Sequence, residues 1–292
     1  MKKISKFLAL ALTLALALSL AACNGGTQDT NPPDTQNPES TQPVGDSKPD
    51  APVVIKVGAT PAPHAAVLEV AKELLKEQNI DLQIQEFDDY ILPNTAVEDG
   101  SLDANYFQHI TYLNNFNEEN GTHLVSVAEV HYEPFAIYAG KTASLDALAD
   151  GAVIAVPNDG TNEARALMLL EAQGLIKLRE GAGLSATKDD VAENPHNYEI
   201  QELEAKLLTS TLQDVDIAII NGNYALGAGL TEDNALAFED AAAAAAPYVN
   251  VLAVKEGREN DEAVQALVKA LQSDAVKQFM QEAYGNAVVP AF

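Results

Sequence analysis

The chain has 292 residues, with 43 acidic and 17 basic side chains and a formal net charge of −26. Such a surface repels nucleic acid and anionic lipid headgroups, so we expect no nucleic-acid partner. The only cysteine is Cys23, which excludes disulfides, thiolate metal sites and a cysteine nucleophile from the rest of the chain.

Residues 1–22 have the pattern of an export signal: three early lysines precede a long run of leucine and alanine. The run ends in Leu20-Ala21-Ala22 just before Cys23, which resembles the lipobox of bacterial lipoproteins. We therefore expect cleavage before Cys23 and acylation of Cys23, as a palmitate-bearing lipoprotein. The acyl chains would hold the protein on the extracytoplasmic face of the cell membrane. The alternative is an ordinary signal peptide with a chance cysteine.

Residues 23–52 contain six prolines among Asp, Ser, Thr, Gln, Asn and Gly, with almost nothing apolar. Such a segment cannot bury enough surface to fold. We predict a disordered tether, with a reach of roughly 30 Å as a coil.

From residue 53 onward, strand patterns alternate with helix patterns, which indicates an α/β fold. We predict strands at 53–59, 82–87, 124–130, 134–139, 153–156, 198–203, 217–220 and 248–254. We predict helices at 64–77, 97–105, 107–117, 161–173, 223–228, 261–271 and 273–284.

Two similar successions of strand, helix and strand begin near residues 53 and 153. We interpret them as two lobes, each a mixed, mainly parallel sheet flanked by helices, with a ligand cleft between them. Lobe I would comprise 53–135 plus 249–292, and lobe II would comprise 136–248. The chain would cross between the lobes at 134–139 and 248–254.

Arg165 falls in the first turn of the helix that follows the strand 153–156. A helix start at the end of a strand favours anions, but a cation there opposes the helix dipole. The residues three and four positions away in the helix are not acidic; they are Thr161, Asn162, Met168 and Leu169. Arg165 is therefore predicted to pair with a carboxylate that comes from outside the protein.

No catalytic motif is present in the sequence, and the five histidines are too dispersed to match a metal-ligand spacing. We therefore expect neither an enzyme nor a bound metal or cofactor. Binding residues are better candidates, because polar and aromatic side chains fall at the ends of predicted strands. They are Tyr90, Phe107, His109, Tyr112, Asn221 and Asn250. Core packing is the competing interpretation for the aromatic residues, whereas an asparagine inside a strand needs a hydrogen-bond partner.

Several ordered segments resemble the methionine-binding lipoproteins that serve ABC importers. The resemblance covers nearly all of residues 53–292 and includes DYILPN (89–94), DANYFQH (103–109), AVPNDGTN (155–162) and PYVN (247–250). It implies a fold like that of periplasmic binding proteins, in which two lobes close on an amino acid.

Position by position, the resemblance implies that Arg165, helped by Asn162, pairs with the carboxylate of the ligand. It also implies that Asn221 and Asn250 hold the amino or carboxylate end.

The same resemblance places Tyr90 and Phe107 on either side of a thioether, with His109 and Tyr112 completing the wall. Sulfur–aromatic contacts are favourable by roughly 0.3–1.5 kcal/mol, which suits a methionine side chain.

From these observations we predict a monomeric solute-binding lipoprotein that captures methionine and delivers it to ABC permease subunits in the membrane. One alternative is a receptor for another small amino acid or a short peptide on the same scaffold. Two others, a secreted hydrolase and a surface adhesin, lack a supporting motif.

Overall fold

The computed structural model describes residues 51–292, which belong to one compact unit. The predicted signal peptide, Cys23 and the tether up to residue 50 lie outside the described residues. None of the helices in this part of the chain is long and apolar enough to cross a membrane.

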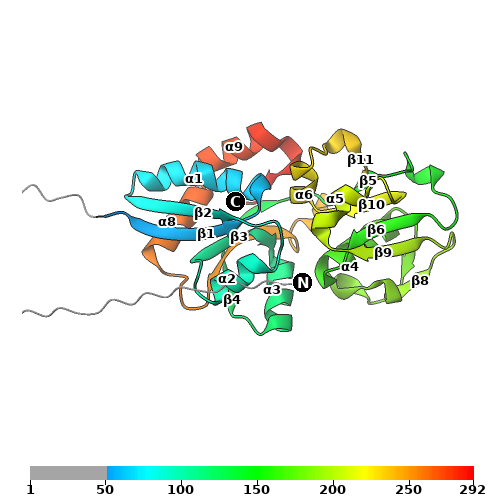
Figure 1. Cartoon of the computed structure of the whole chain (residues 1–292), viewed down its shortest axis with the longest axis horizontal. Coiled ribbons are helices and arrows are strands. Elements are labelled where there is room, and N and C mark those ends of the chain that lie inside the picture. The colour runs from blue at the N-terminus through cyan, green and yellow to red at the C-terminus, as the bar shows by residue number, and fades with distance from the viewer. Residues whose placement is uncertain (1–50) are drawn as a thin grey trace, which may run out of the picture. The chain divides into compact units, whose positions relative to one another are not determined.

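One half of this unit is built on a six-stranded sheet with the strand order β13-β4-β12-β3-β1-β2 (Figure 1). Its strands are β1 (Val53–Ala59), β2 (Ile80–Glu86), β3 (Ala104–His109), β4 (Leu124–Tyr132), β12 (Val249–Lys255) and β13 (Val289–Pro290). Its helices are α1 (Ala66–Lys76), α2 (Leu92–Glu98), α3 (Ile110–Asn120), α8 (Glu262–Leu271) and α9 (Asp274–Tyr284), and a helical turn at Pro61–Ala65 precedes α1.

The other half is built on a five-stranded sheet with the order β11-β5-β10-β6-β9. Its strands are β5 (Ala136–Ala139), β6 (Val153–Pro157), β9 (Glu199–Leu203), β10 (Ile217–Ile220) and β11 (Ala235–Phe238). Its helices are α4 (Gly160–Ala172), α5 (Leu208–Thr211), α6 (Gly222–Gly227) and α7 (Ala241–Ala244), and β7 (Lys177–Leu178) pairs with β8 (Val191–Glu193). Short 3-10 turns lie at Leu145–Ala147, Gly183–Ser185, Lys188–Asp190, Ala205–Leu207, Glu232–Asn234 and Gly285–Ala287.

Both sheets are mixed, as predicted, but parallel pairing does not dominate them. β1 runs parallel to β2 and β3, and β6 runs parallel to β9 and β10. The strands next to the connections between the sheets, β4, β5, β11 and β12, form antiparallel pairs instead. The chain leaves the first sheet along β4 and returns to it along β12, so these two strands run in opposite directions. In the second sheet, it enters along β5 and leaves along β11, which are antiparallel for the same reason.

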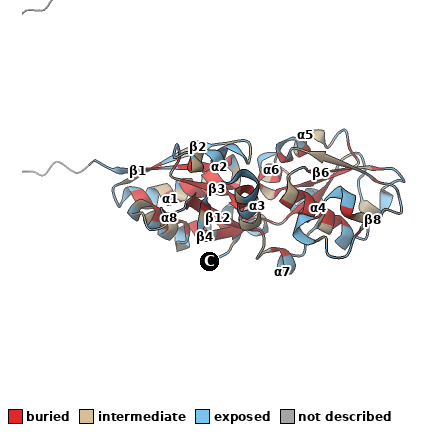
Figure 2. Ribbon diagram, turned by 90° about the horizontal axis from the view of Figure 1, so that it is seen from below, coloured by how far each residue is buried: buried red, intermediate tan, exposed pale blue. Residues whose placement is uncertain are grey.

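Each sheet separates two apolar cores, because alternate residues of a strand point to opposite faces. In β12, Leu252 and Val254 join the core under α1, α8 and α9, whereas Val251 and Ala253 join the core under α2 and α3. Figure 2 shows the buried residues along the strands and the exposed residues on the outer faces of the helices. The predicted two-lobed α/β architecture is thereby confirmed.

The chain changes sheets twice, between β4 and β5 and again between β11 and β12. These crossings, at residues 133–135 and 239–248, are placed differently from our prediction, because 136–139 forms β5 and 249–254 lies in β12. The lobe boundaries 53–135 plus 249–292 and 136–248 remain our proposed division, and the names lobe I and lobe II are used in that sense.

The predicted helix at 97–105 is wrong, and the helix predicted at 107–117 is present but begins three residues later. Helix α2 already ends at Glu98, residues 104–109 form the central strand β3, and α3 begins only at Ile110. Every residue of β3 is buried, including Asn105 and Gln108. Their side chains bond to each other and to Asn94, at 2.6–2.9 Å. The register of β3 against β12 shifts at Phe107, which puts Asn105 and Gln108 on the same face although they are three positions apart. The alternation that marks a strand in the sequence is therefore interrupted.

Helix α4 carries two of the predicted site residues, Asn162 and Arg165, and both are buried. The N-cap is Asp159, so α4 begins one residue before the predicted start at 161; the Oδ1 of Asp159 accepts from the backbone N–H of Asn162 at 3.0 Å. On the far side of α4, the carboxylate of Glu163 accepts from the backbone N–H of Lys188 at 2.8 Å. Burial, together with the nearby charge of Glu202, raises the pKa of Glu163 from 4.5 to about 7.

This raised pKa makes the stability of the protein depend on pH. Between pH 4.5 and about 7, the folded protein holds a proton on Glu163 that the unfolded chain has released. Stability should therefore fall as pH rises through this window. Glu163→Gln should remove this contribution to the pH dependence of stability. The melting temperature of the variant should therefore rise relative to that of the wild type as pH increases. Glu193→Gln, at an exposed position, serves as the control. If the difference in melting temperature between Glu163→Gln and wild type stays constant from pH 4.5 to 8, the raised pKa of Glu163 is contradicted.

Candidate ligand-binding site

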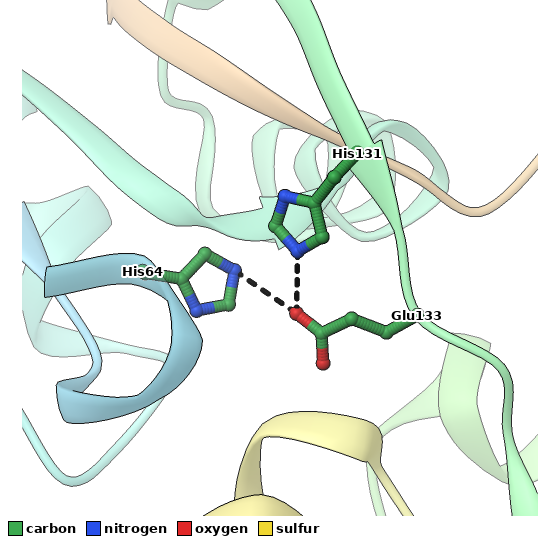
Figure 3. A group of neighbouring side chains, drawn as sticks. All are labelled: His64, His131 and Glu133. Carbon is green, nitrogen blue, oxygen red and sulfur yellow. Dashed lines mark hydrogen bonds and ion pairs between the residues drawn. The ribbon is translucent and has the colours of Figure 1, made fainter. Parts of the chain in front are cut away.

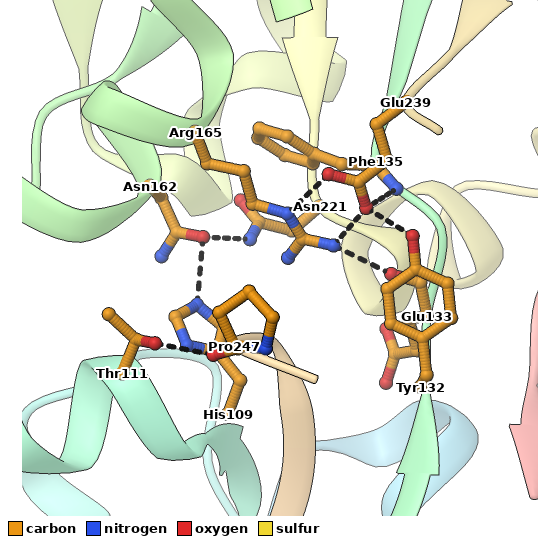
Figure 4. Close-up of polar contacts among 10 residues, drawn as sticks. All are labelled: His109, Thr111, Tyr132, Glu133, Phe135, Asn162, Arg165, Asn221, Glu239 and Pro247. Atoms are coloured by element: carbon orange, nitrogen blue, oxygen red, sulfur yellow. Dashed lines mark hydrogen bonds and ion pairs between the residues drawn. The ribbon is translucent and has the colours of Figure 1, made fainter. Parts of the chain in front are cut away.

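Most of the predicted site residues come together where the two lobes meet. Figure 4 shows His109 of lobe I facing Asn162, Asn221 and Arg165 of lobe II. The aromatic residues lie next to them, because the rings of His109 and Tyr112 are 6.2 Å apart.

Three of the predicted residues form one aromatic cluster in lobe I. The ring of Tyr90 lies 5.8 Å from that of Phe107 and 5.7 Å from that of Tyr112, between ring centroids. Tyr224 of α6 adds a ring from lobe II, 5.1 Å from Tyr90. Phe107 and Tyr112 are buried, and Tyr90 is half-buried. The cluster thus offers a polarisable apolar wall to which both lobes contribute.

His109 has a defined tautomer, because it caps α3. Its Nδ1 accepts from the backbone N–H of Tyr112 at 3.0 Å, so the ring proton resides on Nε2. Burial, and then the positive charge of Arg165, lowers the pKa of His109 to about 3, which keeps the ring neutral at pH 7. Nε2 therefore donates to the Oδ1 of Asn162, 3.2 Å away.

The orientation of the neighbouring amides follows from this donor. The Oδ1 of Asn162 accepts the hydrogen bond from His109, so the Nδ2 of Asn162 donates to the Oδ1 of Asp159 at 2.9 Å. Asn221 also donates to Asn162, through Nδ2 at 2.8 Å. That contact leaves the Oδ1 of Asn221 as a buried acceptor with no partner in the described structure. A buried carbonyl oxygen without a donor is costly, and such a group at the meeting point of two lobes is suited to a donor supplied by a ligand.

Arg165 has a partner within the chain, so our prediction of a cation without an acid is wrong. Its Nε donates to the Oε2 of Glu239 at 2.9 Å, and its Nη2 donates to Oε1 of the same carboxylate. Nη2 also donates to the backbone carbonyl of Glu133 at 2.9 Å. The prediction failed because Glu239 is 74 positions away in sequence and comes close only when the second crossing folds back.

The guanidinium is buried among aromatic rings, and the N–H groups of Nη1 take no part in the bonds to Glu239 and Glu133. Its central carbon lies 4.1 Å from the ring centroid of Tyr248 and 4.7 Å from that of Phe135. Burial alone would lower the pKa of Arg165, but hydrogen bonds to Glu239 and its charge outweigh burial and raise the pKa. Nη1 points to the side where His109 and Asn162 lie (Figure 4). The pairing with Glu239 therefore leaves the Nη1 edge of the cation for an incoming anion.

Asn250 lies beside His109 in the sheet, as its direct partner between β12 and β3. Its Oδ1 is bound by His64, whose Nε2 is 3.1 Å away. The partner that a strand asparagine requires is thus a histidine of the same lobe. The Nδ2 of Asn250 is the end left for a ligand.

Four residues of this region were not singled out as site residues from the sequence: Glu133, Glu239, Tyr224 and Tyr248. Glu239 is one of 43 acidic residues and carries no distinguishing signal. Tyr248 could have been found, because it stands beside Asn250 in the PYVN segment, and its buried hydroxyl has no partner in the described structure. Tyr224 follows Asn221 by three positions, at the start of α6.

A cavity of about 430 Å³ opens beside the aromatic cluster, lined by Tyr90, Tyr112, Asp159 and Tyr224 among others. A larger one, of about 640 Å³, lies near Tyr138 and Tyr284 and includes none of the predicted site residues in its lining. None of the buried site amides lines the smaller cavity, but Asp159, which accepts from Asn162, lies in its wall. An acceptor, a cation and an aromatic wall together can bind a small zwitterion with an apolar side chain.

The sequence profile of the NlpA lipoprotein family matches residues 55–292 of the chain. Among curated proteins, the membrane lipoprotein TpN32 of Treponema pallidum is 47% identical over 239 residues, which cover 81% of this chain and 88% of that protein. The D-methionine-binding lipoprotein MetQ of Salmonella typhimurium is 42% identical over 239 residues, covering 80% of this chain and 87% of that protein.

Solved structures agree in fold. A nutrient-binding protein from Burkholderia cenocepacia, solved bound to methionine, has a TM-score of 0.78 and 42% identity, covering 82% of this chain and all of its own. A periplasmic substrate-binding protein of an ABC transporter from Coxiella burnetii has a TM-score of 0.76 and 42% identity, covering 81% of this chain and all of its own. At these identities, both fold and family are shared.

The buried pair of Arg165 and Glu239 generates a stability prediction. Glu239→Ala should destabilise the protein by about 3–5 kcal/mol, because it leaves a buried guanidinium without its counter-charge. Urea unfolding of the purified protein measures the loss. Replacing both residues, as Arg165→Met with Glu239→Met, should recover part of it. The control is Glu193→Ala, which removes the exposed partner of Lys177 and should change little. If Glu239→Ala and Glu193→Ala lower the free energy of unfolding equally, the buried pair does not stabilise the protein by charge pairing.

Proposed function

The chain belongs to the NlpA lipoprotein family, a family of solute receptors rather than enzymes, and on that basis we propose that it captures methionine outside the cytoplasm and delivers it to an ABC-type importer. The observation that carries this proposal is the unpartnered Oδ1 of Asn221 beside a cation whose Nη1 edge is not used by Glu239. An acceptor and a cation side by side match the ammonium and carboxylate of an α-amino acid.

The two ends of the amino acid are assigned by the polarity of these groups. The ammonium donates to the Oδ1 of Asn221, since that oxygen lacks any other donor. The carboxylate faces Nη1 of Arg165, while Glu239 holds the other side of the guanidinium. Asn250, whose Oδ1 is taken by His64, offers its amide N–H to the carboxylate or to the side chain.

The side chain of the ligand extends toward the rings of Tyr90, Phe107 and Tyr112. Relatives and solved structures named for methionine support a thioether there. Contacts of sulfur with aromatic rings add roughly 0.3–1.5 kcal/mol, enough to favour methionine over an isosteric alkyl side chain by up to about tenfold. His109 and Tyr224 close the ends of this wall.

Closure of the lobes is supported by contacts that join them directly. The hydroxyl of Tyr90 donates to the Oδ1 of Asn223 at 2.6 Å, and the hydroxyl of Tyr224 donates to the carbonyl of Asp88 at 2.9 Å. We infer that the ligand bridges the lobes and stabilises this closed arrangement, because it makes its full set of contacts only there. The importer then recognises the closed receptor.

The membrane attachment is also part of this proposal. Relatives are lipoproteins, and the segment Leu20-Ala21-Ala22-Cys23 provides the acylation site. Cys23 would carry the acyl chains, and residues 23–52 would form the tether. The monomeric receptor would then remain at the extracytoplasmic surface of the membrane, near its permease.

The second candidate is a receptor for another small amino acid. It shares the Asn221 and Arg165 contacts and differs only in what the aromatic wall holds. The curated name of the Salmonella typhimurium relative specifies D-methionine, so both stereoisomers belong in the comparison.

The choice of ligand is tested by thermal shift of ligand-stripped protein against amino acids. L- or D-methionine should raise the melting temperature most, and norleucine, which lacks sulfur, should raise it less. Refolding from urea removes any co-purified ligand beforehand. If glutamine or alanine raises the melting temperature more than either methionine isomer, the second candidate is correct.

The role of Asn221 is tested by calorimetry with methionine and with its analogue that lacks the amino group. Asn221→Ala should weaken methionine binding about tenfold to a hundredfold, since a hydrogen bond to a charged group contributes roughly 1.5–3 kcal/mol. It should leave binding of the desamino analogue almost unchanged.

The matched control is Asn223→Ala, two positions further along α6, which removes the contact with Tyr90 between the lobes. This variant should weaken both ligands equally, because it acts on closure and not on the ammonium. Equal losses for both ligands in Asn221→Ala would place the ammonium elsewhere.

A further inference from the structure

A second polar cluster lies inside lobe I, below the first crossing. His64 comes from the helical turn after β1, His131 from β4, and Glu133 from the residues that leave β4 (Figure 3). The Nε2 atoms of the two imidazoles approach one carboxylate oxygen, Oε1 of Glu133, at 3.3 Å for His64 and 2.7 Å for His131. The exposed fractions of the three residues are 1%, 0% and 6%. The proposed amino-acid site uses none of these three side chains directly.

The other nitrogen of each imidazole is held by a hydroxyl group. Nδ1 of His64 is 2.7 Å from Oγ1 of Thr60, and Nδ1 of His131 contacts the hydroxyl of Tyr106. In the metal-free structure Nε2 of each ring carries the proton, because the oxygens that it contacts can only accept. A hydroxyl can accept as well as donate, so each ring can move its proton to Nδ1 and free Nε2 when a metal ion binds. Metal-binding histidines typically have their second nitrogen fixed in this way.

A fourth donor atom completes the group. Oδ1 of Asn250 lies 3.1 Å from Nε2 of His64. Donors around a tetrahedral zinc-type ion, at about 2.0–2.2 Å from the metal, lie roughly 3.3 Å from one another. The measured separations of 2.7–3.3 Å are shorter than this by up to about 0.6 Å. The ligand atoms of His64, His131 and Glu133 all lie within 4.8 Å of one another, so side-chain adjustments alone can bring them around one ion.

The charge of the cluster also favours a cation. Within the described part of the chain, the ion pairs of the Glu133 carboxylate are with the two histidines alone, and Arg165 reaches only its backbone carbonyl. Burial raises the pKa of the Glu133 carboxyl, and the charge of Arg165 and the backbone N–H of Asn223 oppose this only in part. With neutral imidazoles, a cation at the centre would favour the ionised carboxylate. Two nitrogens and two oxygens suit the borderline ions of the zinc type, whereas magnesium and calcium prefer oxygen alone.

We propose that His64, His131 and Glu133, with Asn250 as fourth ligand, form a binding site for one divalent transition-metal ion of the zinc type. The ion fixes the first crossing to lobe I, because Glu133 belongs to that crossing and the other three ligands belong to the sheet or to the turn beside it. Gly222 at the start of α6 lies against the same carboxylate, where an added Cβ would come within 2.7 Å of Oε2. The site thereby touches both halves of the molecule at the hinge.

The test uses the full chain, stripped with a chelator and loaded with Co²⁺ or Zn²⁺ in two ways: by incubation of the folded protein and during refolding from urea. Cobalt is followed by its visible absorption and zinc by elemental analysis after gel filtration. The expected result is one equivalent of metal, with the intense visible bands of tetrahedral cobalt. Metal binding should be at least tenfold weaker in His131→Gln and Glu133→Gln.

His196→Gln and His123→Gln are the matched controls, since these histidines are exposed and each faces one carboxylate, Asp150 and Glu98 respectively. Both controls should keep the full equivalent. Wild-type protein that takes up no stoichiometric metal by either route would overturn the proposal, whatever the variants do. The same conclusion follows if cobalt is lost in a control variant and retained in Glu133→Gln, or if the bands are those of an octahedral, solvent-exposed ion.

Discussion

The buried ion pair of Arg165 and Glu239 is the constraint on which the centre of the molecule depends. Glu239 belongs to the second crossing, and it also accepts from the hydroxyl of Tyr132, at 2.5 Å, and from the backbone N–H of Phe135, at 2.9 Å, at the first crossing. Arg165 adds helix α4 and the carbonyl of Glu133. Two charges out of water are expensive unless every donor and acceptor is satisfied. The bonds that satisfy the Glu239 carboxylate and two of the three guanidinium nitrogens bring both crossings and α4 into one arrangement. The site and the hinge therefore share one set of bonds.

A second buried carboxylate, that of Glu133, lies two positions before Phe135, whose backbone N–H binds Glu239. One carboxylate is balanced by a guanidinium, and the other faces two neutral imidazoles. The two acids thus fix the same crossing from opposite lobes, one through charge pairing and one through shared hydrogen bonds. Buried polar networks of this kind define one arrangement of the backbone more sharply than apolar packing does, because each bond has a direction.

Local pattern predicted most of the elements, and the reasons for the failures are physical. The strands β1 and β10 and the closing helices are marked by apolar spacing that their own residues provide. Strand β3 is not, because hydrogen bonds from Asn94 replace the apolar pattern. Most site residues were predicted from their positions at the ends of strands and at a helix start, and the resemblance supplied their roles. The structure brings most of them together. The partner of Arg165 did not follow, since a contact across 74 positions leaves no trace in the spacing around either residue.

The polarity of the binding site is inherited from a helix cap. The Nδ1 of His109 accepts the hydrogen bond that caps the start of α3, so Nε2 must donate. This one hydrogen bond sets the orientation of the amides of Asn162 and Asn221. Reversing the first donor would turn the series around, and the same asparagine would then offer N–H groups in place of an oxygen. A descendant of this protein could thus exchange a preference for ammonium for one for an oxyanion through a substitution outside the ligand contacts. Ligand chemistry in such a lineage is then open to change at positions that a comparison of contact residues alone would treat as silent.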